Sequence, residues 1–365
     1  MKFAKQWVLC GAVISSVALS SAVNVASAAD SLSDRLLASA KTFFAPVLAA
    51  SDAEVNAADA VLGRALFWDT RISLDGKTAC ASCHLAEDWS SDKRKFSVNA
   101  KGLPTTMHSQ PMFMAQDQTV LRWYGDRRDG AHQAQGSISG SMGFENAQAV
   151  VPALKSAGYE AAFKAAFPVA SAAASASQTD AVTPENYARA LQAYQRTLRT
   201  PAPFDQFLNG NAQALSTQQL NGLDKFVSYG CVGCHNGALL GGNSLQKFGV
   251  VKDYWLATGS VKVDAGRFTV TKKEEDKYVY RVPMLRNIAK TAPYFHDGSV
   301  DTLEDAVRVM AEVQLGRQAS AADVADITAF LSSLTGNIPK HYAPPAKTVN
   351  NAAGAITPTA ALSSR

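Results

Sequence analysis

The sequence predicts a mainly α-helical protein built from two units that pack together. Three observations lead to this fold class. Apolar residues recur at helical spacing in many segments, runs with the two-residue period of a strand are scarce, and the motif C-x-x-C-H occurs twice. Cys80 and Cys231, which begin the two motifs, are 151 residues apart, so each half of the chain holds one motif.

The first 28 residues have the composition of a secretory signal peptide. Lys2 and Lys5 form a charged start, an apolar run follows from Trp7 to Val23, and Ala26-Ser27-Ala28 has the small residues of a cleavage site. An uncleaved membrane anchor is the alternative, but the apolar run is shorter than the roughly 20 residues that cross a bilayer. We expect cleavage after residue 28, and Cys10 is lost with the signal.

Removing residues 1–28 from the 365-residue chain leaves 337 residues, enough for two domains with substantial cores. The net charge of +4 falls to +2 without the two lysines of the signal, and no long basic run follows. These features argue against nucleic acid as a partner. No later stretch is long and apolar enough to span a membrane, so we expect a soluble mature protein in the periplasm.

Several segments have the apolar period of an α-helix, and most of them begin with a recognisable cap. Thr183-Pro184 starts one, Ser216 with Gln219 forms a capping box for another, and Thr302 precedes a third. The expected helices lie at 31–48, 57–67, 183–198, 216–229, from 302 onward, and 320–334. The inward residues of the last two are Leu303, Ala306, Val307, Met310, Val324, Ile327, Phe330, Leu331 and Leu334.

Only short segments have the character of a strand, the best being Arg267–Val270 and Tyr278–Val282. The Ala/Ser-rich stretch Val169–Val182 is expected to be a surface loop, and the chain beyond Tyr342 a disordered tail. These features divide the chain into a signal peptide (1–28), a first domain (29–200) and a second domain (201–341) with one C-x-x-C-H motif each, and the tail (342–365).

The C-x-x-C-H motif matches the attachment site of c-type haem. There, two thiols bond the haem vinyl groups and the adjacent histidine binds the iron from one face. A zinc site would place its cysteine pairs closer together and need no histidine after each, while disulfides or thiol redox pairs are open alternatives in an oxidising compartment. The motifs predict two covalently bound haems, held by Cys80, Cys83 and His84, and by Cys231, Cys234 and His235.

The second ligand of each iron decides what a haem can do. Met310 is a natural candidate, because methionine opposite histidine raises the potential of a c-type haem. On the residues alone, ordinary core packing is the commoner reason for a methionine on this apolar helix face. Trp123 can be explained as a buried core aromatic and Gln133 as an ordinary surface residue, so the residues alone assign neither of them a role beside a haem.

Three stretches resemble the bacterial di-haem cytochrome c peroxidases, a family that includes the MauG-type enzymes. They are residues 62–76 (LGRALFWDTRISLDG) ahead of the first motif, 280–298 (YRVPMLRNIAKTAPYFHDG) and 306–316 (AVRVMAEVQLG). The resemblance spans roughly residues 55 to 337, nearly the whole mature chain.

The resemblance implies a role for each haem. The second haem, on His235 and Met310, would be the high-potential centre that takes electrons from a donor. The first haem, on His84, would be the peroxidatic one. Trp123 is similar to the family tryptophan between the haems, and Gln133 to the glutamine of the pocket where peroxide binds.

The chain departs from the family pattern at two positions. Where a second histidine covers the first iron in many members, Phe96–Gly102 contains none. The first haem is therefore expected to be open, as in MauG-type members, with His108 as the alternative ligand. The position of the distal glutamate holds Gly143, and Glu145 lies two residues on. Glu145 or His132 is the candidate proton carrier for breaking the peroxide bond.

The family also holds a calcium ion between its domains. The backbone carbonyls that bind it map to Thr291 and Pro293, and a side chain maps near Ser109, where asparagine is usual. His296 lies in a segment that matches the family and is expected in the wall near the haems. His341, next to the tail, is expected to be exposed.

Together these features predict an enzyme that reduces hydrogen peroxide to water with electrons from a cytochrome c or a cupredoxin. A MauG-like oxidase that modifies a protein substrate is one alternative, although those enzymes carry tyrosine where this chain has Met310. A non-catalytic electron carrier is the other, and it would need a strong second ligand for the His84 haem. The sequence leaves a homodimer open.

Overall fold

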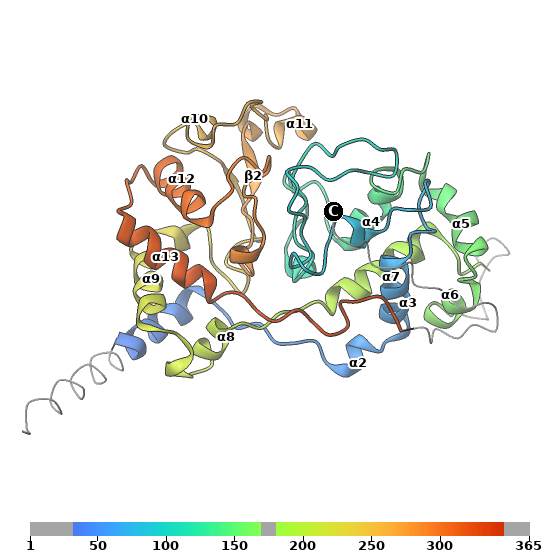
Figure 1. Cartoon of the computed structure of the whole chain (residues 1–365), viewed down its shortest axis with the longest axis horizontal. Helices are drawn as coiled ribbons and strands as arrows, with labels where there is room; N and C mark the ends of the chain where they lie inside the picture. The colour runs from blue at the N-terminus through green and yellow to red at the C-terminus, as the bar shows by residue number, and fades with distance from the viewer. Residues whose placement is uncertain (1–31, 169–179, 347–365) are drawn as a thin grey trace, which may run out of the picture.

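The computed structural model describes residues 32–168 and 180–346, which form a mainly helical protein with one pair of short strands. Its buried apolar side chains fall into two large clusters. We call the parts around them the first unit, residues 58–198, and the second unit, residues 203–334. Figure 1 shows the units side by side, joined along one edge by extended segments. The predicted fold class is confirmed. The predicted signal peptide, residues 169–179 of the predicted loop and residues 347–365 of the predicted tail lie outside the described residues.

The first unit has helices at both ends of its sequence and long loops between them. Its helices are α3 (Ala58–Trp68), α4 (Gly130–Ser139), α5 (Val150–Ser156), α6 (Glu160–Ala166) and α7 (Pro184–Arg196), preceded by the short α2 (Asp52–Val55). α7 packs against both α3 and α4. The first motif lies in the loops between α3 and α4.

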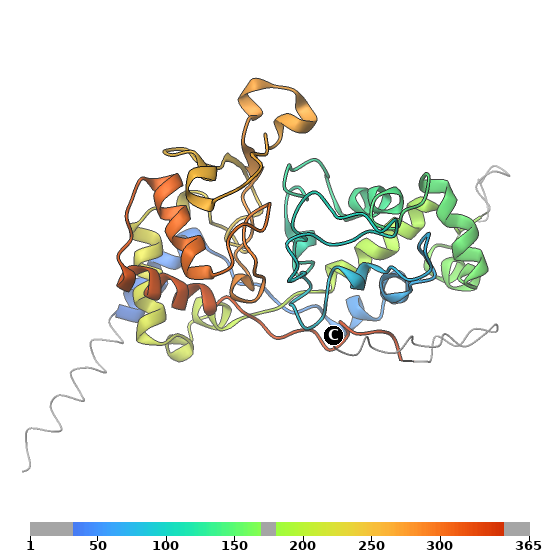
Figure 2. The same cartoon turned by 45° about the horizontal axis from the view of Figure 1, so that its top comes forward.

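The second unit repeats this plan around α9 and α13. Its elements are α8 (Pro203–Leu208), α9 (Thr217–Ser228), α10 (Tyr254–Thr258), α11 (Phe268–Thr271), α12 (Leu303–Leu315) and α13 (Ala321–Ser332), with β1 (Leu245–Lys247) antiparallel to β2 (Val279–Arg281). α9 packs along α13, and α12 packs against α13. Figure 2 shows that the segment with α11 extends from the body as an arm, which we define as residues 259–278.

A glycine at a close helix crossing is common to the two units. An added Cβ at Gly63 of α3 would lie 1.9 Å from the carbonyl oxygen of Ala190 in α7. An added Cβ at Gly222 of α9 would lie 1.9 Å from the carbonyl oxygen of Asp326 in α13. Glycine alone permits such an approach, because it has no side chain. In each unit this crossing holds the helix that precedes the C-x-x-C-H motif.

The predicted helix starts are confirmed. The N-cap side chains Thr183, Ser216, Thr302 and Ser320 each accept a hydrogen bond from the backbone N–H three residues on. Gln219 completes the predicted capping box of α9. A helix at residues 32–43 and α3 match the first two predicted helices to within a few residues.

One of the two predicted strands is wrong. β2 lies within Tyr278–Val282 as expected and pairs with β1. Residues 267–270 instead contribute to α11, a short helix in the arm. A strand needs a neighbour for its backbone groups, and β1 with β2 is the one named strand pair of the described residues.

Each end of the described chain packs in the unit that is farther from it in sequence. Residues 32–44 precede the first unit in sequence, yet Leu36, Ala40 and Phe44 pack in the second core. Tyr342 follows the second unit but is 3% exposed and packs in the first core. The predicted domain boundaries therefore differ from the packing at both ends, and Tyr342 is not part of a disordered tail.

A buried ion pair anchors this arrangement. The side chains of Arg286 and Asp205 are 0% and 3% exposed, and two hydrogen bonds of 2.7 and 2.8 Å join them. The same carboxylate accepts the backbone N–H groups of Val47 and Ala202, and Arg286 also donates to the Ala238 carbonyl. The pair thus ties the incoming N-terminal segment and α8 to the loop after the second motif.

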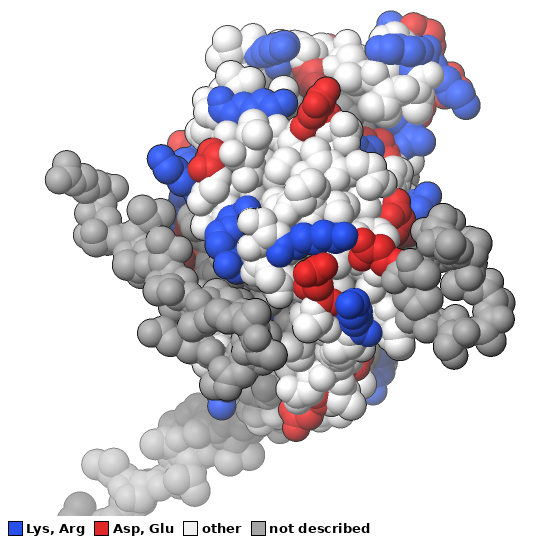
Figure 3. All heavy atoms as spheres, turned by 90° about the vertical axis from the view of Figure 1, so that its right-hand side faces the viewer, with Lys and Arg blue, Asp and Glu red and all other residues white. Residues whose placement is uncertain are grey.

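Charged side chains are mixed on the end of the molecule formed by the first unit. Figure 3 shows basic and acidic residues interspersed on this face, with no large area of one sign. Within residues 32–168 and 180–346, no helix combines the length and the apolar character needed to cross a membrane.

Replacing Asp205 with alanine should destabilise the protein strongly, because the buried Arg286 would lose its partner. Removing one member of a buried ion pair costs about 3–5 kcal/mol. Lys155→Ala, which breaks the exposed pair with Asp180, is the control and should change stability little. Denaturant unfolding of both variants measures the difference, and similar midpoints would contradict the anchoring role.

Candidate functional site

Both C-x-x-C-H motifs fold into the same turn. Cys80–Ser82 and Cys231–Gly233 form the short 3-10 turns η1 and η6. The backbone N–H of His84 donates to the Cys80 carbonyl at 3.1 Å, and that of His235 to the Cys231 carbonyl at 2.9 Å. Such a turn aligns residues three apart, so both thiols of a motif lie on one side. This is the arrangement that covalent attachment of haem requires.

Matching hydrogen bonds orient the two histidines. Nδ1 of His84 lies 3.0 Å from the carbonyl oxygen of Ser90, and Nδ1 of His235 lies 3.0 Å from that of Leu240. A carbonyl oxygen only accepts, so Nδ1 carries the proton and Nε2 keeps its lone pair. Burial lowers the pKa of both imidazoles, which favours the neutral ring. Each Nε2 is therefore ready to bind a metal ion.

The surroundings of the cysteines favour neutral thiols. The four cysteines of residues 32–168 and 180–346 form no disulfide. Burial raises the pKa of Cys80 to about 12 and that of Cys231 to about 11. Zinc sites and redox pairs need thiolates, so these sites fit neither alternative. The same residues also contain no group of three histidine, cysteine or acidic side chains placed to bind a metal.

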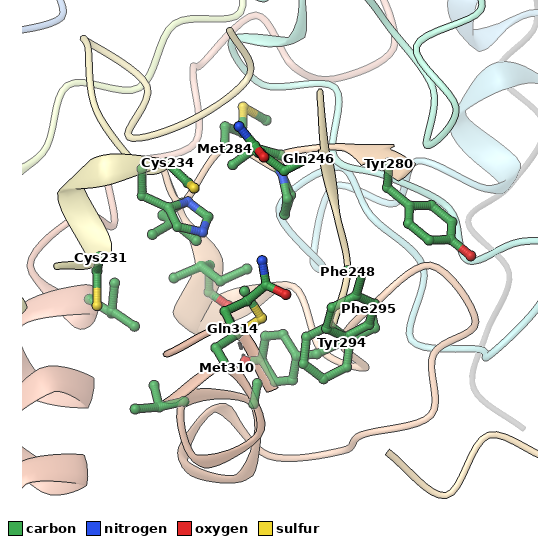
Figure 4. Close-up of a pocket in the computed structure, with 18 of the residues that line it drawn as sticks. Cys231, Cys234, Gln246, Phe248, Tyr280, Met284, Tyr294, Phe295, Met310 and Gln314 are labelled. Atoms are coloured by element: carbon green, nitrogen blue, oxygen red, sulfur yellow. Dashed lines mark hydrogen bonds between the residues drawn. The ribbon is translucent and has the colours of Figure 1, made fainter. Parts of the chain in front are cut away.

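A cavity lies beside the second motif, where the two units meet. Cys231, Cys234 and His235 line one part of its wall. Met310 of α12 lies across the pocket from Cys234, as Figure 4 shows. Apolar side chains of α9, α12, α13 and the loop after β2 form much of the remaining wall. The structure thus brings together the residues predicted to hold the second haem.

Arg281 supplies an independent test of whether haem fits this cavity. It lines the cavity and is 2% exposed. Its guanidinium donates to the Gln118 side chain and to the carbonyls of Arg122 and Val282. Burial lowers its pKa to about 10, and no carboxylate among the described residues offsets that effect. A buried cation without a counter-ion fits a ligand that brings its own anions, as haem does with its propionates.

A second methionine, which sequence reasoning missed, lines the same cavity. Met284 is 6% exposed and packs with Val47, Met114 and Leu239 in a small cluster. Met310 instead projects from α12, and Figure 4 shows the two methionines on different parts of the wall. No local pattern distinguishes them, because the difference depends on the position of α12 relative to the second motif.

The C-terminal segment supports the first motif from behind. The hydroxyl of Tyr342 donates to the carbonyl oxygen of His84 at 2.6 Å, and its ring packs edge-on against Phe113. His341 is half-buried and its Nε2 lies 3.0 Å from the Thr197 hydroxyl, so the expectation of an exposed histidine is wrong. The sequence contains no signal for these contacts, since they join residues far apart in the chain.

Trp123 and two histidines lie where the units meet. The indole N–H of Trp123 donates to the His108 carbonyl at 3.0 Å, and its ring is 6.3 Å from that of His296. The backbone N–H of His108 donates to the His296 carbonyl at 2.9 Å. All three residues line the cavity, as was expected for His296. Nε2 of His108 is buried and has no hydrogen-bond partner among the described residues.

Small residues meet on the loops beside the first motif. Gly143 packs on Ala100, and an added Cβ at Gly143 would lie 3.2 Å from the Cβ of Ala100. The carbonyl oxygen of Val98, in the same loop, lies 4.0 Å from Sγ of Cys83. The structure therefore places the segment Phe96–Gly102, which lacks the family's histidine, against Gly143, which stands at the position of the family's glutamate. Both lie close to the first motif.

Gln133, His132 and Glu145 are the residues predicted to act on peroxide at the first haem. Gln133 and His132 are half-buried in α4, and Glu145 is exposed. None of the three lines the cavity of the second motif. Their contact with a haem on His84 stays a prediction.

The residues predicted to bind calcium fit that ion poorly. Thr291 and Pro293 both line the cavity. The hydroxyl of Ser109, however, donates to the carbonyl of Cys83 at 3.1 Å. Calcium takes six to eight oxygen ligands, and this set offers it chiefly two backbone carbonyls.

The fold and the two motif sites define a two-unit haem protein of the c-type cytochrome class. Residues 57–213 match the model of the di-haem cytochrome c peroxidase family. The cytochrome c551 peroxidase of Pseudomonas aeruginosa is 38% identical over 283 residues, which cover 76% of this chain and 79% of that protein. The cytochrome c551 peroxidase of Nitrosomonas europaea is 34% identical, covering 81% and 85%. The chain therefore belongs to the di-haem cytochrome c peroxidase family.

Solved structures agree with this assignment. A MauG-like protein associated with microbial copper homeostasis has a TM-score of 0.67 and 25% identity, covering 82% of this chain and 96% of that one. The di-haem peroxidase BthA of Burkholderia thailandensis has a TM-score of 0.63 at 18% identity, covering 81% and 93%, and shows a shared fold.

Met310→Leu should lower the potential of one haem, because a thioether opposite histidine raises that potential. Met284→Leu is the matched control, since it removes a thioether from the same cavity. A redox titration of both variants tests the assignment. A fall in potential with Met284→Leu and none with Met310→Leu would exchange the two roles.

Arg281→Gln should also lower the potential of the haem in this cavity. The buried positive charge of Arg281 stabilises the reduced haem, and the variant lacks that charge. Arg196→Gln removes an exposed charge from α7 and should leave that potential nearly unchanged. Equal shifts in the two variants would show that Arg281 does not act on the haem.

Proposed function

We propose that this chain reduces hydrogen peroxide to water with electrons from a small donor protein. The observation that carries the proposal is the difference between its two motif sites. The second site faces a methionine and a buried cation. The first site lies beside the segment Phe96–Gly102, which lacks the family's histidine, and beside Gly143, which stands at the position of the family's glutamate. When bound, the haems supply the redox chemistry, in which peroxide takes up two electrons and two protons and yields two waters.

The residues of the first unit would hold an open iron site. The Ser90 carbonyl fixes the His84 ring, so Nε2 binds from one face only. Neither Ala100 nor Gly143 has a side chain that could bind the iron, so the first site would stay open to peroxide. Gln133 would hydrogen-bond the bound peroxide, and Glu145 or His132 would carry the proton between its oxygens.

The residues of the second unit would hold a site that accepts electrons and stores them. His235 and Met310 would hold this haem, and an iron with two protein ligands has no position for peroxide. Arg281 would pair with a propionate and favour the reduced haem. Trp123 belongs to the first unit and lines the cavity, so it would couple the two sites.

The partners and location follow from the same family. Curated relatives are named cytochrome c551 peroxidases, which supports a small cytochrome c as the donor, with a cupredoxin as the alternative. Residues 1–28 would direct export to the periplasm. The two domains would be residues 29–200 and 201–341, except that residues 32–44 pack in the second core and Tyr342 in the first. The protein would form a homodimer.

A MauG-like oxidase is the second candidate, because the first site has no histidine in Phe96–Gly102. The MauG protein of Methylophilus methylotrophus is 26% identical over 303 residues. Met310 favours the peroxidase, since the resemblance implies tyrosine at this position in enzymes of the MauG type.

The purified protein should oxidise reduced cytochrome c when peroxide is added, without prior reduction, because its first haem is open. Its resting ferric spectrum should contain a high-spin component that peroxide removes. The double variant Cys80→Ala with Cys83→Ala should lose one of two covalent haems by mass and all peroxidase activity. A resting protein with two low-spin haems and no response to peroxide would favour the electron carrier instead.

A further inference from the structure

Four oxidisable rings lead from the cavity wall toward the surface of the second unit. Tyr280 lines the cavity, and its ring is 6.3 Å from that of Tyr254 in α10. The Tyr254 ring is 5.1 Å from Trp255, and Trp255 is 4.9 Å from Tyr278. We call these four residues the aromatic relay. Since electron tunnelling weakens steeply with distance, rings in near contact exchange electrons rapidly.

Burial changes along the relay in one direction. Tyr280 is 5% exposed and Tyr254 is fully buried. Trp255 and Tyr278, at the other end, are both half-buried and reach the surface. Figure 4 shows Tyr280 on the wall away from Cys231, with its hydroxyl directed out of the pocket. The relay therefore joins the haem cavity to solvent on the side of α10 and the arm.

The first ring of the relay has a proton acceptor. The hydroxyl of Tyr280 donates to a carboxylate oxygen of Asp264 at 2.9 Å, within the range for direct proton transfer. The same carboxylate accepts the Tyr124 hydroxyl at 2.7 Å. Burial raises the pKa of Tyr280 well above its usual range, so the phenol stays protonated and must release its proton when it loses an electron.

Another tyrosine of the cavity wall lacks the conditions for this role. Tyr229 donates its hydroxyl to Asp323, but the guanidinium of Arg317 lies 5.2 Å from the centre of its ring. A cation over the ring opposes the loss of an electron from it. None of the four relay rings has such a cation among the described residues.

We propose that the aromatic relay carries oxidising equivalents from the haem cavity to Trp255 and Tyr278, which form a surface site for one-electron oxidation. The inference rests on the proposed function, since peroxide is the terminal oxidant. Tyr280 gives one electron to the haem that would be held in the cavity, oxidised at the expense of peroxide, and gives its proton to Asp264. Tyr254 refills Tyr280 with an electron and with the proton of its own hydroxyl, which is hydrogen-bonded to that of Tyr280. Trp255 or Tyr278 then refills Tyr254, which recovers its proton from Asp264 through Tyr280, and two such transfers match one peroxide. The surface ring is left one electron short, Tyr278 releasing its proton to water, until a reductant at the surface replaces the electron.

The experiment adds peroxide to the di-haem protein without any electron donor. Peptide mass spectrometry then locates oxidised tyrosine and tryptophan, and a freeze-quenched electron paramagnetic resonance spectrum detects the radical. We expect oxidation at Trp255 and Tyr278. Tyr280→Phe should reduce oxidation at both residues severalfold. Trp255→Phe should remove oxidation at position 255 and leave it at Tyr278, because the Tyr278 ring is also 6.4 Å from that of Tyr254.

Tyr124→Phe is the matched control, because it removes a hydroxyl bonded to the same carboxylate but lies outside the relay. It should leave oxidation of Trp255 and Tyr278 unchanged. Turnover of reduced cytochrome c, measured on the same samples, separates the two proposals. Normal turnover with oxidation located elsewhere, or with equal oxidation of Trp255 in Tyr280→Phe, would overturn the relay alone. Failure to consume peroxide at all would overturn the proposed function and the relay with it.

Discussion

The hydrogen bond from each histidine Nδ1 to a backbone carbonyl is the interaction on which both sites depend. It places the proton on one nitrogen and leaves the other free for a metal. The carbonyls belong to Ser90 and Leu240, each a few residues beyond its motif, so the loop that closes over the histidine also orients it. Tyr342 then holds the His84 backbone from the opposite end of the chain. The local turn and the distant support act on the same residue.

The two units use the same turn and the same close crossing of helices, yet their sites differ in what surrounds them. The second cavity combines a thioether with Arg281, a buried charge without an acidic partner. The first motif lies beside Ala100 and Gly143, which are too small to act as ligands. A peroxidase with two haems needs this difference, because one iron must be accessible to peroxide and the other must hold an electron ready for it.

The boundary between the units is built from aromatic rings and imidazoles. Trp123 and His108 come from the first unit, and His296 and Tyr280 from the second. Backbone hydrogen bonds cross the same boundary, including the one from His108 to His296. Such a boundary fixes the distances between these rings. It also gives the second unit a continuous set of rings that reaches the surface at α10.

The sequence by itself determined the features that depend on neighbours in the chain. The motif turns, the capped helices at Thr183, Ser216, Thr302 and Ser320, and strand β2 all follow from local pattern. Resemblance to a family added Met310 and Trp123. Only the tertiary structure decided that residues 32–44 pack in the second core, that Tyr342 supports His84, and that Arg281 lies unpaired in the cavity. Residues 267–270 have strand-like composition but no partner strand, so they form a helix. These outcomes depend on contacts between segments far apart in sequence, and neither periodicity nor composition records such contacts.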